Sequence, residues 1–377
     1  MNDDAAEPGD LGEPGDPGDP GDPGDIVAAR TVIEHAIAGR IFPAATLEAG
    51  SSAGAIWSDA LGTLTFDAGA PPASLDTSFD LASLTKVIAT TTILMDLVRT
   101  GRVQLNDRVA DLFAEWRGAD RADVTVRDLL EHASGLPARL VDAPPKSRRE
   151  FEHDICRMPL EYRPRTQSIY SDLDFILLGF LAADRGEASL RELLYEVSGF
   201  SRTLEIASLT FDLPPDVRML AAPTLPLDDD PRRGRALAGE VHDIYAAALG
   251  GAAGHAGLFG TAPAVGAFAR TVLGAARGDD GLPPPFSPDL VALFTTKSAL
   301  PASSRALGWD TMLETSSCGT AMSPKAFGHV GYTGTSLWID PGRDRYFVLL
   351  TNRACGGGSL EDMRTVRRAF HDALGAL

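Results

Sequence analysis

The sequence predicts an α+β fold, in which strands from both ends of the chain share one sheet and a mainly helical domain is inserted between them. Three observations lead to this fold class. Strand-like runs occur towards the two ends of the 377 residues, helical patterns fill the middle, and 44% of the residues are hydrophobic, enough for a sizeable core. We therefore expect a discontinuous sheet domain, residues 26–80 plus 305–377, and a mainly helical domain over residues 81–304.

The first 25 residues form an acidic tail that we expect to be disordered. They contain nine acidic residues and no basic residue, and so carry half of the formal net charge of −18. A glycine recurs every third residue from Gly9 to Gly24, and the last part repeats Pro-Gly-Asp. So few apolar side chains cannot offset the entropy lost on ordering. An extended tether, kept open by charge repulsion and proline, is the functional alternative.

The ordered chain is expected to begin with a helix over Ile26–Ala38, where apolar residues recur at helical spacing. Short runs separated by glycine and serine predict strands at residues 44–49, 54–58 and 61–66. Helical periodicity then predicts helices at residues 84–99, 126–132, 172–185, 190–198 and 264–276. Near the C-terminus, buried-strand patterns predict strands at residues 336–339 and 346–351, before a last helix at residues 360–376.

Two segments of the middle region are expected to be loops. Leu213–Glu240 is rich in proline and aspartate and predicts a long surface loop, a kind of segment that is often functional. Gly250–Gly260 holds five glycines around His255, but it lacks the Gly-x-x-x-x-Gly-Lys pattern of a phosphate-binding loop. For His255, a structural hydrogen-bonding role is favoured over a place in a cleft.

Composition also excludes several classes of protein. No basic stripe offers a footprint for nucleic acid, and no apolar run reaches the roughly 18 residues that span a bilayer. The N-terminus shows no signal peptide, which predicts a cytoplasmic protein, although a start site further upstream would allow export. The three cysteines (Cys156, Cys318 and Cys355) fit reduced thiols, and the histidines show no metal-binding spacing. The oligomeric state is left open.

The first motif that can carry chemistry is Ser83-Leu84-Thr85-Lys86, at the start of a predicted helix. Residues three apart on a helix lie on one face, so the serine and lysine side chains come within contact. A buried lysine can lose its proton and act as the base for a serine nucleophile, whereas arginine cannot. Only four of the 34 basic residues are lysine, so Lys86 is mildly informative. Taken alone, the pair is better explained as a serine at the start of a helix and a solvated lysine.

Two further motifs are equally ambiguous when taken singly. Tyr170-Ser171-Asp172 offers a phenol that can act as a base near a cation, but it also fits a helix N-cap. The segment Gly328–Trp338 reads as a glycine-rich strand that lets a ligand approach the backbone, whose N–H groups are then candidate oxyanion donors. It fits a bulged strand with a buried His329 equally well.

Together, in this order and spacing, the three motifs resemble the active-site motifs of the serine β-lactamase and penicillin-binding-protein superfamily. The likeness is closest to its class C-like branch, which includes class C β-lactamases, DD-carboxypeptidases and esterases. Four segments carry it in addition to the tyrosine motif, namely 79–86, 124–137, 254–259 and 350–353. The resemblance implies an antiparallel sheet flanked by helices, with the active site where the inserted helical domain meets it.

The resemblance also implies a role for each matching residue. Ser83 is expected to be the nucleophile, Lys86 its proton partner, and Tyr170 the general base or the proton shuttle to the leaving group. The backbone N–H groups of Ser83 and Tyr332 are expected to form the oxyanion hole. Gly331 and Thr333 belong to the matching strand motif and are expected to bind or support the substrate. No metal and no organic cofactor is implied, because serine acyl chemistry requires none.

Two departures from the family pattern bear on the substrate. Asp172 stands where class C enzymes usually have asparagine, and a carboxylate beside Lys86 favours the ammonium form and shifts the base role to Tyr170. His329 and Val330 replace the lysine and the hydroxyl residue of the Lys-Thr-Gly motif, a natural clamp for a substrate carboxylate. A mostly neutral histidine weakens that clamp.

The sequence therefore favours a serine hydrolase of esterase type, acting on a small-molecule acyl substrate. A DD-carboxypeptidase or β-lactamase is the alternative within the superfamily, against which the missing signal peptide argues, because peptidoglycan lies outside the cytoplasm. A non-catalytic binding protein on the same fold is the alternative from another class.

Overall fold

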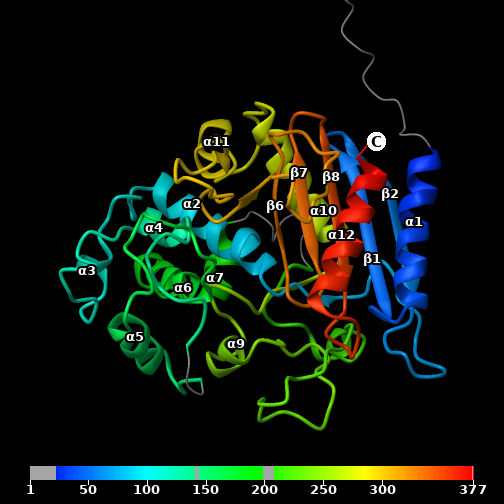
Figure 1. Ribbon diagram of the computed structural model, residues 1–377, viewed down its shortest axis with the longest axis horizontal. Coiled ribbons are helices and arrows are strands. Elements are labelled where there is room, and N and C mark those ends of the chain that lie inside the picture. The colour runs from blue at the N-terminus through cyan, green and yellow to red at the C-terminus, as the bar shows by residue number, and fades with distance from the viewer. Residues whose placement is uncertain (1–22, 141–143, 198–207, 376) are drawn as a thin grey trace, which may run out of the picture.

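The computed structural model describes residues 23–140, 144–197, 208–375 and 377. It is built on a six-stranded antiparallel sheet with the strand order β2-β1-β8-β7-β6-β5 (Figure 1). The strands are β1 (Ala44–Ser51), β2 (Gly54–Gly62), β5 (Asp310–Thr311), β6 (Phe327–Val330), β7 (Ser336–Asp340) and β8 (Arg345–Thr351). β1 pairs with β8, so the two ends of the chain share one sheet. The predicted α+β fold with an antiparallel sheet is confirmed.

Helices cover both faces of the sheet. α1 (Pro23–Ala38) and α12 (Leu360–Leu374) lie side by side on one face and enclose a hydrophobic cluster that includes Phe347 (Figure 1). α10 (Ala262–Ala276) packs on the opposite face, in the cluster that contains Val348. Neighbouring residues of β8 thus point into different layers, as the two-residue period of a strand requires.

The chain between β2 and β5 is mainly helical. Its helices are η1 (Lys86–Thr91), α2 (Thr92–Arg99), α3 (Val109–Leu112), α4 (Val126–Leu130), α5 (Arg148–Arg157), α6 (Asp172–Gly186), α7 (Leu190–Val197), α8 (Pro215–Arg218), α9 (Ile244–Ala248), α10 and α11 (Pro288–Thr295). α6 is buried along most of its length, and it shares one hydrophobic cluster with η1, α2 and α10. A short ladder of β3 (Phe79–Asp80) and β4 (Phe259–Gly260) lies in the same region.

The structure corrects several predicted boundaries. α1 begins at Pro23, so residues 23–25 belong to a helix and not to the tail, and residues 1–22 lie outside the described residues. The strands predicted at 54–58 and 61–66 are one strand, β2, which ends where Gly62 adopts a φ of 79°. The helix predicted at 84–99 contains a wider π-helical stretch, η1. Residues 198 and 376, predicted as helix ends, lie outside the described part of the chain.

Besides the short helices α3, α8 and α9, two longer helices of the described chain, α5 and α11, were not predicted from the sequence. α5 is rich in charged residues and buries only Phe151, Ile155 and Cys156, too few for a distinct apolar stripe. α11 follows closely after a run of three prolines, residues 283–285, which is typical of a loop. Among the described residues, no helix combines the length and the apolar character needed to cross a membrane.

Candidate active site

Ser83 lies in a tight turn between β3 and η1. The preceding residue, Ala82, has a φ of 47°, a left-handed conformation that costs on the order of 1–3 kcal/mol for a residue with a side chain. The Ala82 N–H donates to Asp80 Oδ1 at 2.8 Å, and Thr333 Oγ1 donates to the Asp80 carbonyl at 2.7 Å. Burial raises the pKa of Asp80 to about 6. These bonds hold the strained turn that presents Ser83.

Gly331 allows the β6–β7 turn to approach the turn around Ser83 closely. A Cβ at this position would clash with Thr335 Oγ1 and would lie 2.7 Å from the Leu81 carbonyl oxygen. Thr335 Oγ1 itself donates to that carbonyl at 3.0 Å. Glycine is therefore required where the two turns meet.

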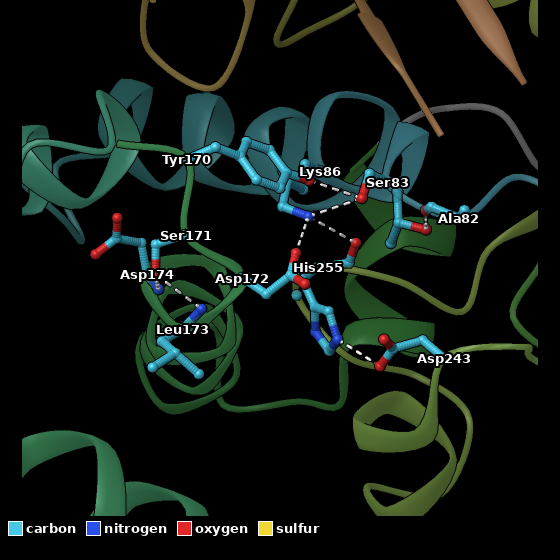
Figure 2. Close-up of polar contacts among 12 residues, drawn as sticks. Ala82, Ser83, Lys86, Tyr170, Ser171, Asp172, Leu173, Asp174, Asp243 and His255 are labelled. Atoms are coloured by element: carbon cyan, nitrogen blue, oxygen red, sulfur yellow. Dashed lines mark hydrogen bonds and ion pairs between the residues drawn. The ribbon is translucent and has the colours of Figure 1, made fainter. Parts of the chain in front are cut away.

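Lys86 lies directly behind Ser83 and is fully buried (Figure 2). Its Nζ donates to Ser83 Oγ at 3.0 Å, to Asp172 Oδ1 at 2.8 Å and to the His255 carbonyl at 3.2 Å. Three acceptors match the three donors of an ammonium group. Burial alone would lower the pKa of Lys86, but the Asp172 carboxylate and the Tyr170 hydroxyl outweigh it, so that the pKa is raised. Asp172 thus lies beside Lys86 in the structure.

Tyr170 immediately precedes α6 and approaches Ser83 from another side. Its hydroxyl donates to Ser83 Oγ at 2.7 Å, and Lys86 Nζ lies 4.8 Å from its ring centroid. Burial raises the pKa of Tyr170, although the Lys86 ammonium works in the opposite direction. Ser171 caps α6 by accepting from the Leu173 and Asp174 N–H groups. Ser171 therefore provides the helix cap, and the neighbouring Tyr170 makes the contact with Ser83.

Two backbone N–H groups beside Ser83 Oγ are open to a ligand. Within the described part of the chain, no acceptor is found for the N–H of Ser83 or of Tyr332, and both residues line the cavity. Arg367 donates to the Gly331 carbonyl at 2.6 Å, and Arg353 donates to the Tyr332 carbonyl at 2.6 Å and 3.1 Å. The peptides on both sides of Tyr332 are thus fixed, and their N–H groups suit the stabilisation of a negatively charged oxygen.

A chain of charges extends the Lys86–Asp172 pair to the surface. Arg139 bonds Asp172 at 3.0 Å and Asp243 at 3.1 Å, and His255 Nε2 lies 2.7 Å from Asp243 (Figure 2 shows the last contact). His255 therefore makes the structural hydrogen bond favoured from the sequence, and it also lines the cavity. Arg139 and Asp243 are not predicted from the sequence. They lie in loops 104 residues apart, where no periodic pattern marks them.

The groups around Ser83 open into a cavity of about 320 Å³. Of the predicted site residues, it is lined by Ser83, Tyr170, Asp172, His329, Gly331 and Tyr332. Lys86 and Thr333 lie behind this wall, both buried.

His329 is buried in the cavity wall. Its Nδ1 lies 2.9 Å from the Val330 carbonyl oxygen, and its Nε2 has no partner among the described residues. Burial and the nearby Lys86 ammonium hold the pKa of His329 well below its usual value. The imidazole is therefore neutral at pH 7 and supplies no cation.

Arg305 is a cavity-lining cation that the sequence does not indicate. Its guanidinium lies 5.3 Å from the ring centroid of Tyr170, and its ion pair with Asp310 is long at 3.8 Å. Among the described residues, no three or more His, Cys, Asp or Glu side chains are grouped to hold a metal ion.

Comparisons with known proteins identify the family of this fold and site. The family model described as Beta-lactamase matches residues 48–371. A relative from Escherichia coli (strain K12), named "Putative D-alanyl-D-alanine carboxypeptidase", is 33% identical over 315 residues, 74% of this chain and 70% of the relative.

Solved structures agree on the fold. EstCE1, described as a hydrolase with promiscuous acyltransferase activity, superposes with a TM-score of 0.72 at 18% identity, over 92% of this chain and 98% of its own. A class C β-lactamase from Rhodobacter sphaeroides gives a TM-score of 0.71 at 19% identity, over 92% and 98%. Because the family model spans most of the sequence and the E. coli relative exceeds 30% identity, the chain belongs to the β-lactamase family of serine hydrolases.

Proposed function

We propose that this serine hydrolase forms an acyl-enzyme on Ser83 and acts on small carboxylic esters. The observation that carries the proposal is the position of Ser83 Oγ, which receives hydrogen bonds from Lys86 and Tyr170 beside two open backbone N–H groups. A nucleophile, a proton-transfer group and donors for an oxyanion are the parts that acyl transfer requires.

In the proposed reaction, each catalytic group has a defined role. The Tyr170 phenolate, stabilised by the Lys86 ammonium, takes the proton of Ser83 as Oγ bonds to the ester carbonyl carbon. The carbonyl oxygen becomes negative and binds the N–H groups of Ser83 and Tyr332. The intermediate then expels the alcohol, to which Tyr170 returns the proton. A water molecule then attacks the acyl-enzyme in the same way and gives a proton to Tyr170. The bond between the acyl carbon and Ser83 Oγ breaks, and Tyr170 returns the proton to Ser83 Oγ.

Tyr170→Phe is expected to lower kcat/KM for p-nitrophenyl butyrate by about 10²- to 10³-fold, within the range of general acid–base catalysis. Since the pKa of Tyr170 is raised, its phenolate fraction at pH 7 is small and grows with pH. Wild-type kcat/KM should therefore rise between pH 7 and pH 9, and the variant should lose this rise. A variant with wild-type rates, or with the same pH profile, contradicts the base role of Tyr170.

In β6, two residues differ from the Lys-Thr-Gly motif of the family, and both differences favour esters over substrates with a free carboxylate. His329 is neutral, and Val330 has no hydroxyl, so this strand offers neither a cation nor a side-chain donor to a carboxylate. An ester needs neither group. The apolar residues at the mouth of the cavity, Leu227, Tyr332 and Leu360, also suit an uncharged substrate.

DD-carboxypeptidase or β-lactamase activity is the second candidate, and Arg305 favours it. This arginine lines the cavity near Tyr170 and His329, and its weak pairing with Asp310 leaves guanidinium donors for a substrate carboxylate. Relatives named as D-alanyl-D-alanine carboxypeptidases point in the same direction.

Arg305→Met tests this second candidate directly. A hydrogen bond to a charged group contributes about 1.5–3 kcal/mol. If Arg305 binds a substrate carboxylate, the variant should lower kcat/KM for a D-Ala-D-Ala peptide by about 10- to 100-fold relative to the same peptide with an amidated C-terminus. An unchanged ratio excludes this role of Arg305. Arg233→Met, which changes an arginine outside the cavity lining, is the matched control.

A fluorophosphonate probe and a substrate panel test the main proposal. We expect the probe to label Ser83, located by peptide mass, and simple esters to turn over faster than penicillin or D-Ala-D-Ala peptides. Rapid penicillin or peptide turnover with slow ester turnover selects the second candidate. A folded protein that neither reacts with the probe nor hydrolyses any panel member is a non-catalytic binding protein, and the proposal then fails.

A further inference from the structure

The loop between α8 and α9 is fixed against the cavity. Thr224 and Leu237 pair through two backbone hydrogen bonds of 3.0 Å and 2.8 Å. Within the loop, Arg232 bonds the buried carboxylate of Asp230 at 2.7 Å and reaches the Val241 and His242 carbonyls at 2.7 Å and 3.0 Å. The loop is thus closed on itself, with a buried ion pair at its tip.

Two hydrogen bonds hold this loop to the chain that follows β8, and a third contact closes the loop on itself. The Leu225 N–H donates to the Ala354 carbonyl at 2.7 Å, and Asn352 Nδ2 donates to the Pro223 carbonyl at 3.1 Å. His242 Nε2 lies 3.1 Å from the Leu225 carbonyl oxygen. These bonds fix the loop next to the chain that follows β8. The proline- and aspartate-rich segment is therefore a fixed wall of the cavity.

Leu227 of this wall is one of three large apolar residues at the cavity mouth. Leu227, Tyr332 and Leu360 all line the cavity, and they keep 43%, 40% and 54% of their surface exposed. They come from three separate segments, namely the loop, the β6–β7 turn and the start of α12. Single exposed apolar residues are normal, but a group around one opening marks a binding surface. We call these three residues the apolar collar.

The Tyr332 ring in the collar is held from both sides. It stacks on the His242 ring, with centroids 5.2 Å apart and planes at 26°, and the Arg353 guanidinium lies 4.6 Å from its centroid. His242 is the same residue that contacts Leu225 of the loop. A preformed apolar surface costs little ordering entropy when a ligand binds to it.

Charged groups of the cavity wall lie close to Tyr170. Arg305 lies over its ring, and Arg139 bonds the neighbouring Asp172. Tyr170 is the group that would protonate the leaving alcohol, so the leaving group points to this charged side. The oxyanion would occupy the N–H groups of Ser83 and Tyr332. The remaining substituent of the carbonyl carbon, the acyl chain, is then directed to the apolar collar.

We propose that the apolar collar binds a hydrophobic acyl group, so that the substrates are esters of acids with several carbon atoms and not acetates. This inference rests on the ester hydrolysis proposed above. Burial of one methylene is worth at most about a fourfold change in affinity, and about twofold on a half-exposed surface. Four additional methylenes, from acetate to hexanoate, should therefore raise kcat/KM by about tenfold.

The test compares p-nitrophenyl acetate, butyrate and hexanoate, with each kcat/KM divided by the rate of alkaline hydrolysis. This series keeps the leaving group constant. We expect a hexanoate-to-acetate ratio of about 10 for the wild type, and a three- to fivefold lower ratio for Leu227→Ser and for Leu360→Ser. Leu220→Ser is the matched control, because Leu220 belongs to the same loop and is 64% exposed, but it is not among the residues that line the cavity. Its ratio should equal that of the wild type.

The ratio is measured within each variant, so a partial loss of folded protein cancels. A wild type that hydrolyses acetate and hexanoate equally well overturns the inference while the proposed function stands. Unchanged ratios in both collar variants also overturn it. Methyl acetate and hexyl acetate differ in the alcohol and share one acyl group. If the wild type hydrolyses hexyl acetate faster than methyl acetate and Leu227→Ser does not, the collar binds the alcohol, and the assignment of the acyl group to the collar is wrong. If no ester turns over and the fluorophosphonate probe does not label Ser83, the proposed function fails, and this inference fails with it.

Discussion

Ser83→Ala is expected to lower ester hydrolysis by at least about 10⁴-fold, the largest effect of any single substitution in this chain. The variant removes the only atom that can carry the acyl group in the proposed mechanism, and losses of this size are typical when a serine nucleophile is removed. The measurements are kcat for p-nitrophenyl butyrate and the mass of the protein after rapid quenching. The wild type should gain the mass of a butyryl group, and the variant should gain none.

The fold of Ser83→Ala should be preserved. Lys86 keeps its bonds to Asp172 and to the His255 carbonyl, so no buried charge loses its partner. We expect a melting temperature within a few degrees of the wild type. Ser168→Ala is the matched control, because Ser168 donates to the Glu131 carbonyl and is not among the residues that line the cavity. Ester turnover of Ser83→Ala above one per cent of the wild type would contradict the assignment of the nucleophile.

The grouping of the site residues could be predicted because the order of the motifs along the chain resembles that of the serine β-lactamase and penicillin-binding-protein superfamily. Spacing and capping explain only the local positions: Ser83 and Lys86 are one helical turn apart, and Tyr170 and Asp172 stand at the N-terminus of α6. Taken alone, these positions left each motif ambiguous. The structure then brings Tyr170 within 2.7 Å of Ser83, across 87 residues of sequence.

Arg139, Asp243 and Arg305 could not be predicted, because their positions depend on loops that only the complete fold brings together. Arg139 follows the turn after α4, and Asp243 caps α9, a helix of five residues. Neither setting leaves a periodic pattern in the sequence. The preference for esters rested on His329 and Val330, which weaken the Lys-Thr-Gly clamp for a substrate carboxylate. Burial and the Lys86 ammonium lower the pKa of His329, but Arg305 adds a cation to the cavity wall, so a direct comparison of substrates decides between the two candidates.

The elements of the fold differ in the same way: the local sequence predicts some of them, and others depend on contacts with distant parts of the chain. β8 was recognisable because residues 346–350 form a continuous apolar run, and residues 346–351 are all buried in the structure. β5 has only two residues, Asp310 and Thr311, and exists because β6 pairs with it. The π-helical stretch η1 is likewise a result of packing, since all six of its residues are buried. It carries Lys86 and so lies at the site, where such stretches are frequent.

Lys86→Met is expected to affect stability and activity together. In the variant, the buried Asp172 carboxylate loses Lys86 and keeps its ion pair with Arg139, and breaking a buried ion pair on one side costs about 3–5 kcal/mol. Because Arg139 still compensates part of the charge, we expect the free energy of unfolding to fall by about 3 kcal/mol. The loss of the cation that stabilises the Tyr170 phenolate should also lower kcat by at least about 10³-fold. Urea unfolding and ester hydrolysis measure the two effects.

The double variant Lys86→Met/Asp172→Asn separates the two effects. It removes both charges of the pair, and replacing a complete buried ion pair by neutral groups of similar size is often close to neutral for stability. Its free energy of unfolding should therefore return to within about 1 kcal/mol of the wild type, while kcat remains as low as in Lys86→Met. Recovery of both quantities would mean that Lys86 only compensates the charge of Asp172, and the ammonium would have no part in proton transfer. Recovery of stability alone assigns Lys86 to the chemistry of Ser83.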